Sequence, residues 1–485
     1  MDMKKNRPYL KSFAKYVSLN ILGMLGVSCY VLADTFFISN GIGQLGLTAL
    51  DIVMPVFGFI QGISLLFGVG GGIKYAVAKA EGKQKEANNV FTTTLLLSAI
   101  FSLIFILLGA FASDALATML EATEDVFGMV SQYLQVVLLF GTAFVFQMVI
   151  GCFVRNDGNP RLSMIATLVS SLFNIVFDYI LIYPLNMGIL GAVLATGFSP
   201  VVGLFILSFH WILKKNAVKA EKSKINARTS FSIMALGFPS LVTEFSGSIV
   251  AIVFNSIIFD IAGDVGRASY GIIANIAFVI LSMYTGVASG AQPLISEAHG
   301  KNDLKAKNTL LRYSLITGGV VSVVIYILIA CLNKPITAAF NSENIGELAQ
   351  LTELGLIIYF TGSIFASFNA IFSSYFAAIE KTLPSQIITL LKGLILIIPF
   401  AYLFSFLLDM TGVWLSYAVT EAVVLAIAII IYSVFRKHTK AKMKLLKENA
   451  DSEDVANEQN ETERKNVEDN IDSENTGNSP EQNMP

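Results

Sequence analysis

Apolar segments of about 20 residues or more follow one another along the chain from near its start to residue 436. Of the 485 residues, 54% are hydrophobic and 14% are charged, whereas soluble proteins carry about 25% charged residues. Segments of this length cross a bilayer as α-helices, which satisfy their own backbone hydrogen bonds. The sequence therefore predicts an all-α polytopic membrane protein with twelve transmembrane helices. The predicted spans are 12–38, 51–78, 89–112, 127–153, 161–183, 189–213, 231–259, 268–297, 304–331, 349–378, 384–408 and 412–435.

The loops between these spans alternate in charge, which supports the span count. Every second loop is basic, and the loops between them hold acidic residues such as Glu121 and Glu124. The basic loops contain Lys79, Lys83, Lys85, Arg155, Arg161, Lys214, Lys215, Lys219, Lys301, Lys305 and Lys307. Loops rich in Lys and Arg stay on the cytoplasmic side of a membrane. We therefore expect a multi-pass protein of the cell membrane with both termini in the cytoplasm.

The chain contains an internal repeat of six spans. Segment 68–83 aligns without a gap onto 286–301, and Pro160, Gly188 and Thr196 align onto Pro384, Gly412 and Thr420. An even number of spans per repeat preserves orientation, so the repeats are parallel. Such repeats are typical of transporters, which handle substrate at the interface of the two halves.

The repeat and the composition together predict the domain boundaries. Residues 1–213 form a first six-helix bundle, 214–230 a cytoplasmic linker, and 231–436 a second bundle across a central cleft. From residue 437 a basic stretch passes into a tail rich in Asn, Glu, Asp and Ser. Few apolar residues remain there to bury, so residues 437–485 are predicted to be a disordered cytoplasmic tail.

Four polar residues inside the predicted spans of the first half are candidates for an ion-coupling site. Asn174 and Asp178 are four residues apart and share a helix face. An antiparallel hairpin centred on Met187 would bring Asp178 level with Thr196, and Asp34 lies at a similar depth in the first span. A charged residue inside lipid costs about 2.5–3.5 kcal/mol on insertion scales, so both acids should face the protein interior.

The second half serves as a control for this interpretation. The repeat places Asn255, Ile398 and Tyr402 where the first half has Asp34, Asn174 and Asp178, and only Thr196 is kept, as Thr420. This asymmetry favours a site for H⁺ or Na⁺ built from hard oxygen ligands. The alternative is an Asp that hydrogen-bonds its Asn and Thr neighbours and locks the hairpin.

Other polar and aromatic residues suggest a substrate surface. Glu244 lies near the middle of its span, where it either meets a cationic substrate or, with Glu421, offers Lys392 an ion-pair partner. Lys74, near a cytoplasmic end, is expected to snorkel. Flexible Met and flat aromatic side chains suit loosely specified ligands, although they are also ordinary helix packing. The candidates for substrate binding are Glu244, Met54, Phe57, Met148, Met283 and Tyr284.

The sequence resembles the multidrug and toxic compound extrusion (MATE) family over residues 10–436. The similar segments are 32–38 (LADTFFI), 174–178 (NIVFD), 237–239 (GFP) and 290–295 (GAQPLI). The resemblance implies export of organic, often cationic, compounds in antiport with H⁺ or Na⁺. It also implies, as in one branch of the family, a coupling site at Asp34, Asn174, Asp178 and Thr196. Glu244 is similar to an acid that other members use, and Leu19-Asn20 stands where many members carry a proline.

Other classes fit less well. A major-facilitator transporter would have Gly-x-x-x-Asp-Arg after its second helix, where this chain has segment 80–84 (AEGKQ). A lipid-linked intermediate flippase would need a more basic cavity. The loops are too short for the site of a membrane enzyme, and the glycines at 70–72 lack the context of a phosphate loop. We therefore expect a monomeric transporter without cofactor, enzymatic activity or nucleic-acid partner, whose metal binding is limited to Na⁺ at the coupling site.

Overall fold

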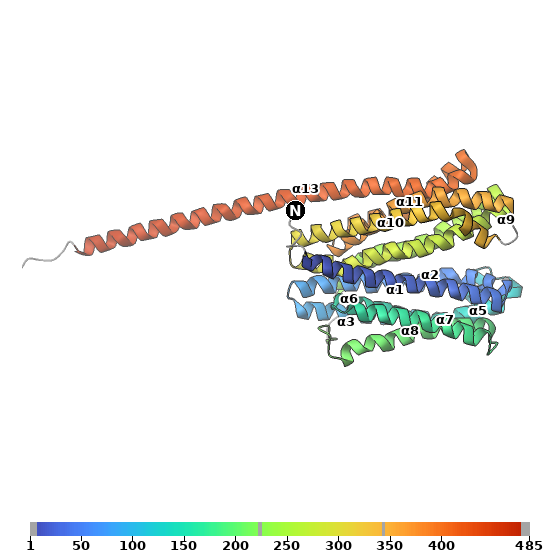
Figure 1. The fold of residues 1–485 in the computed structure, drawn as a ribbon. Coiled ribbons are helices and arrows are strands. Elements are labelled where there is room, and N and C mark those ends of the chain that lie inside the picture. The colour runs from blue at the N-terminus through green and yellow to red at the C-terminus, as the bar shows by residue number, and fades with distance from the viewer. Residues whose placement is uncertain (1–6, 222–225, 342–344, 477–485) are drawn as a thin grey trace, which may run out of the picture. The chain divides into compact units, whose positions relative to one another are not determined.

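The computed structural model describes residues 7–221, 226–341 and 345–476, and every regular element in these ranges is a helix. The elements are α1 (Arg7–Gly41), α2 (Gln44–Ala80), α3 (Gln84–Phe111), α4 (Ser113–Met119), α5 (Glu124–Leu139), α6 (Gly141–Asn156), α7 (Pro160–Ile182), α8 (Gly188–Ile212), α9 (Ala227–Gly300), α10 (Leu304–Phe340), α11 (Gly346–Ala378), α12 (Thr382–Leu390), the π-helical turn η1 (Leu391–Ile395) and α13 (Ile397–Thr476). The all-α prediction is confirmed (Figure 1).

The two longest helices, α9 and α13, are each interrupted by a break in helical geometry. The described chain has nine helices long and apolar enough to cross a membrane, and α5 with α6, bent by 43°, makes a tenth. Helix α9 leaves helical geometry at Ala262 and Gly263, and α13 does so at Leu408 and Asp409. Gly263 has a φ of 55°, a conformation that glycine adopts without steric cost. Counting both sides of each break gives the twelve predicted spans.

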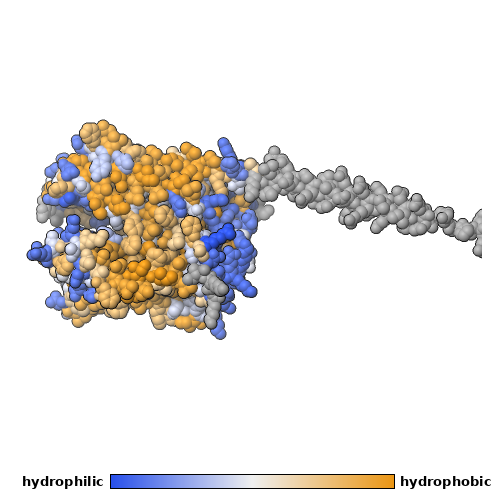
Figure 2. All heavy atoms as spheres, turned by 180° about the vertical axis from the view of Figure 1, so that it is seen from behind, coloured by the Kyte–Doolittle hydropathy of each residue, from blue (hydrophilic) through white to orange (hydrophobic). Residues whose placement is uncertain are grey.

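Apolar side chains cover the outside of the bundle. Figure 2 shows a broad hydrophobic band between two hydrophilic ends. Large apolar side chains are exposed at the surface, among them Phe205, Phe231 and Phe406. Exposed apolar surface of this extent marks a membrane-contacting protein. The predicted multi-pass architecture is therefore confirmed.

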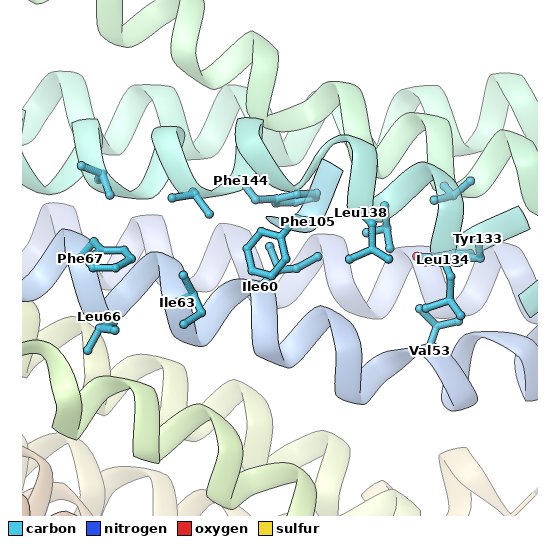
Figure 3. Close-up of a cluster of buried hydrophobic side chains, with 14 of the residues drawn as sticks. Val53, Ile60, Ile63, Leu66, Phe67, Phe105, Tyr133, Leu134, Leu138 and Phe144 are labelled. Atoms are coloured by element: carbon cyan, nitrogen blue, oxygen red, sulfur yellow. The ribbon is translucent and has the colours of Figure 1, made fainter. Parts of the chain in front are cut away.

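Each half of the bundle has its own apolar core. In the first half (residues 7–213), one face of α2 packs against α3, α5 and α6. The residues that Figure 3 labels in this core are Val53, Ile60, Ile63, Leu66, Phe67, Phe105, Tyr133, Leu134, Leu138 and Phe144. In the second half (residues 227–426), Tyr284, Phe360 and Trp414 are fully buried. The halves meet through α1 and α2 on one side and α9 on the other.

The start of the predicted linker is fastened to the first half. The Asp157 carboxylate, just after α6, accepts hydrogen bonds from the backbone N–H groups of Ala217 and Val218 at 2.8 and 3.3 Å. The Val218 side chain is fully buried in the first-half core, and the backbone N–H of Lys219 donates to the Asn88 side chain. Residues 216–221 therefore belong structurally to the first half, and residues 222–225 lie outside the described ranges.

The end of the chain differs from the prediction. The last part of the chain, from Ile427 onward, forms a unit of its own. The backbone is helical as far as Thr476, whereas composition predicted disorder from Lys437 onward. Lys and Glu, which are frequent here, are good helix formers, and pairs of them three or four residues apart support a helix without an apolar face. Residues 477–485 lie outside the described ranges.

Candidate coupling site

The α7–α8 hairpin carries three of the four predicted coupling residues. Ser170 Oγ donates to the Ser199 carbonyl at 2.6 Å, and Ser199 Oγ donates to the Ser170 carbonyl at 2.8 Å. One turn further along, Asn174 Nδ2 donates to Thr196 Oγ1 at 3.2 Å. Thr196 thus lies opposite Asn174, and not level with Asp178 as the sequence suggested. The helices end at Ile182 and restart at Gly188, so the hairpin is centred two residues before Met187.

Helix α1 brings Asp34 to the same level as the hairpin residues. Close contacts of Gly26 with Leu168 and of Gly41 with Ile182 show that α1 and α7 run side by side in the same direction. Asp34 lies between these two contacts on α1, as Asn174 and Asp178 do on α7. The exposed fraction is 8% for Asp34, 4% for Thr196 and 0% for Asn174 and Asp178. The structure therefore assembles all four predicted residues in one buried place.

The oxygen atoms of this place lack hydrogen-bond donors. Among the described residues, Asp34 Oδ1, Asn174 Oδ1 and both carboxylate oxygens of Asp178 are buried and have no hydrogen-bond partner. The carboxyl groups of Asp34 and Asp178 interact with each other. Two carboxylates that share one buried place repel each other, so a proton on one of them or a cation beside them would relieve the repulsion. The arrangement can hold a proton between the acids or a hard cation among the oxygens.

Two tyrosines complete the site and were not predicted. Tyr133, on α5, is 3% exposed and lies beside Thr196. Tyr30 precedes Asp34 by one turn of α1 and lies within electrostatic range of Asp34, Asp178 and Glu244. The spacing of Tyr30 from Asp34 was a usable signal in the sequence. No sequence pattern connects Tyr133 to α8, because α5 reaches that helix only through tertiary packing.

The predicted substrate residues are scattered. A Cβ added at Gly62 on α2 would lie 3.7 Å from Glu244 Cβ, so Glu244 faces the first half across the seam between the halves. Met54 is 40% exposed, and Phe57 packs edge-to-face on Phe144 with ring centroids 5.3 Å apart. Of the remaining candidates, Met148 packs against Gly68, Met283 is half-buried, and Tyr284 lies in the second-half core.

The intramembrane charges of the second half are arranged differently from the expected ion pair. The Asn369 side chain donates to Glu421 Oε2 at 2.7 Å and to the Glu421 carbonyl at 2.8 Å. Lys392, in η1, is within electrostatic range of Glu421, but within the described ranges no ion pair of Lys392 is found. In the first half, the Lys74 side chain is 24% exposed and its ammonium group forms an ion pair of 2.9 Å with Glu380.

Comparison with known proteins gives consistent similarities. The profile of the MatE family matches residues 20–180 and 239–403. The chain is 24% identical over 435 residues to the multidrug export protein MepA of Staphylococcus saprophyticus, covering 88% of this chain and 94% of that one. MepA of Staphylococcus aureus is 24% identical over 430 residues, with coverages of 88% and 94%.

Solved structures share the fold. A MOP superfamily transporter from Pyrococcus furiosus superposes with a TM-score of 0.82 at 24% identity, covering 88% of this chain and 95% of that one. A mutant of the Vibrio cholerae MATE transporter VcmN superposes with a TM-score of 0.83 at 19% identity, with coverages of 90% and 99%.

Proposed function

The chain belongs to the MatE family of transporters, and from this we propose that it exports organic, often cationic, compounds across the cell membrane in antiport with H⁺ or Na⁺. The MepA relatives are multidrug export proteins and align over nearly their whole length. That likeness supports multidrug export over a lipid-linked intermediate flippase.

The observation that carries the coupling proposal is the set of buried oxygens without donors at Asp34, Asn174 and Asp178. Uncompensated carboxylates in a membrane interior are costly, and a proton or Na⁺ would remove the cost. The acids lie on α1 and α7, so occupation of the site changes how these two helices pack. A bound ion can favour one conformation only if it binds that conformation better than the other.

Glu244 supports a route from the ion site to the substrate. Its carboxylate and those of Asp34 and Asp178 all lie within electrostatic range of Tyr30. A cationic substrate near Glu244 would repel a cation held by the two Asp residues. Competition of this kind would make export of one cation depend on uptake of the other. In this proposal Tyr30 lies between the two positions and Glu244 selects for positive charge.

Reconstitution into proteoliposomes tests the proposal. A fluorescent organic cation is followed while a pH gradient and a Na⁺ gradient are imposed separately, without ATP. We expect export with one of the two gradients and loss of that export in Asp178→Asn. Export by neither gradient, from correctly folded protein, would contradict the proposed function. Glu244→Gln should narrow the range of exported cations more than it changes the response to the gradient.

A further inference from the structure

The two halves touch closely at the end of the bundle where α1 begins and α2 ends. A Cβ added at Gly70 would lie 2.0 Å from the Ile233 carbonyl oxygen, and one at Gly237 would lie 1.8 Å from the Leu66 carbonyl oxygen. Beside these backbone contacts, Ile73 of the first half packs against Leu236 of the second. In Figure 1, α9 approaches α1 and α2 near this end and diverges from them toward the other. This end is closed in the present conformation.

One ion pair crosses between the halves at the closed end. Lys74 Nζ, on α2, lies 2.9 Å from Glu380 Oε1, two residues after α11. Lys74 follows Ile73 in the chain, and Glu380 follows Ala377 by three residues, so the pair borders the small apolar contact of Ile73, Leu236 and Ala377. The two charged side chains are 24% and 27% exposed. Water therefore reaches the pair but not the apolar contact beneath it.

Glu380 adopts a backbone conformation that is unfavourable for a residue with a Cβ atom. Its φ of 57° lies in the left-handed region, at a helix C-terminal position where glycine is usual. The Glu380 N–H donates to the Ala377 carbonyl at 2.9 Å, so the helix end is satisfied whatever the side chain. A residue with a Cβ is disfavoured in this conformation. Glycine would relieve the backbone at this position but would remove the carboxylate that pairs with Lys74.

We propose that the Lys74–Glu380 ion pair is a charge latch that holds the two halves together at this end and separates when the transporter changes conformation. This inference rests on the proposed function, since alternating access requires the halves to part here. A partly exposed pair contributes little free energy, so the latch biases the equilibrium without locking it. Its loss should raise the population of the state open at this end by about fivefold.

The test is a distance measurement between the halves. Spin labels at Lys85→Cys and Lys305→Cys, with Cys29, Cys152 and Cys331 replaced by Ser, report the separation at this end by pulsed electron paramagnetic resonance. We expect Glu380→Gln and Lys74→Glu each to increase the long-distance population. The exchanged pair, Lys74→Glu with Glu380→Lys, should restore the wild-type distribution. Lys301→Gln is the matched control, because Lys301 pairs with Glu297 within one helix.

A second variant separates the latch from folding. Glu380→Gly relieves the backbone and should melt no lower than wild type in detergent, yet it should shift the distances as Glu380→Gln does. An unchanged distribution in both variants, or failure of the exchanged pair to restore it, would overturn the latch. If distances shift as expected while wild-type protein exports nothing, the latch stands and the proposed function fails.

Discussion

Asp178 and Asp157 are both buried carboxylates of the first half, and their surroundings are opposite. Asp157 accepts hydrogen bonds from Tyr75 Oη at 2.6 Å, from His210 Nε2 at 2.9 Å and from the Ala217 N–H at 2.8 Å. Neither carboxylate oxygen of Asp178 has a hydrogen-bond partner among the described residues. A buried carboxylate whose hydrogen-bond donors are in place stabilises the fold, whereas one without donors needs a proton or a cation to offset its burial.

The ionisation of Asp157 fits its structural role. Burial acts to raise the pKa of Asp157, but hydrogen bonds from His210, Lys79 and Tyr75 outweigh burial and hold the pKa below its usual range. The group is therefore charged throughout the neutral range. It ties α2, α8 and the start of the linker to the end of α6.

The largest effect is expected at the unsatisfied acid. Asp178→Asn keeps the volume and removes the charge, so the protein should fold and bind substrate while gradient-driven export falls by about tenfold or more. Export in proteoliposomes and substrate binding in detergent would be measured on the same preparation. Asp51→Asn, at an exposed acid of α2, is the control and should export normally. If Asp178→Asn exported at the wild-type rate, Asp178 would not be a coupling residue.

The second test asks whether the two membrane acids act together. Asp34→Asn should impair export as Asp178→Asn does, because either change removes a shared proton or cation. Residues that act as a unit are not additive, so the double variant should be little worse than either single one. A double-mutant cycle on export rates measures this directly. Additive losses would indicate two independent sites.

Asp157 should behave in the opposite way. Asp157→Asn should lower the free energy of unfolding by about 2–4 kcal/mol, because several buried donors lose a charged acceptor. Export per folded molecule should change little. Denaturant unfolding in detergent, followed by tryptophan fluorescence, gives the first quantity, and export normalised to folded protein gives the second. A stable Asp157→Asn protein that cannot export would place Asp157 in the transport mechanism.

The stability difference between wild type and Asp157→Asn should depend on pH. A carboxyl with a lowered native pKa stabilises fully above its unfolded-state pKa of about 3.9 and loses that contribution as pH falls toward the native value. The stability difference between wild type and Asp157→Asn should therefore be equal at about pH 7 and pH 5 and shrink only below about pH 4.

The smallest effect is expected at Glu421, which has the partner Asn369. Gln at this position still offers an oxygen to the Asn369 amide, so Glu421→Gln should change stability by less than about 1 kcal/mol and leave gradient-driven export intact. Thermal melting and export would be measured together. A coupling defect in Glu421→Gln would show that a hydrogen-bonded acid can also serve transport, which would weaken the distinction drawn from Asp157 and Asp178.

The sequence predicted those features that depend on local spacing. Span ends near residues 259 and 408 agree with the breaks at Ala262 and Leu408, because apolar periodicity stops where a helix leaves the membrane. The i, i+4 spacing of Asn174 and Asp178 and their absence from the repeat identified residues that the structure places together. The depth of Thr196 was misjudged by one turn, since the centre of a hairpin depends on where both helices end.

Contacts between helices that are far apart in the sequence could not be predicted from local spacing. Tyr133 reaches Thr196 from α5, and Lys74 meets Glu380 306 residues later in the chain. Neither pair has a spacing or a repeat that signals it in a single sequence. Such contacts arise from how the helices pack, and many different residue pairs would satisfy the same hydrophobic pattern.

The reciprocal serine bonds of the α7–α8 hairpin constrain how this protein could change its ion preference. Ser170 and Ser199 each donate to the other's carbonyl, so the hairpin behaves as one stiff piece and holds Asn174 and Thr196 at a fixed spacing. The width of the ion site is then set by how far α1 stands from that piece. We therefore expect that a shift between large and small coupling ions is reached by exchanging residues of α1 that contact the hairpin, such as Gly26, while the hairpin sequence is left untouched.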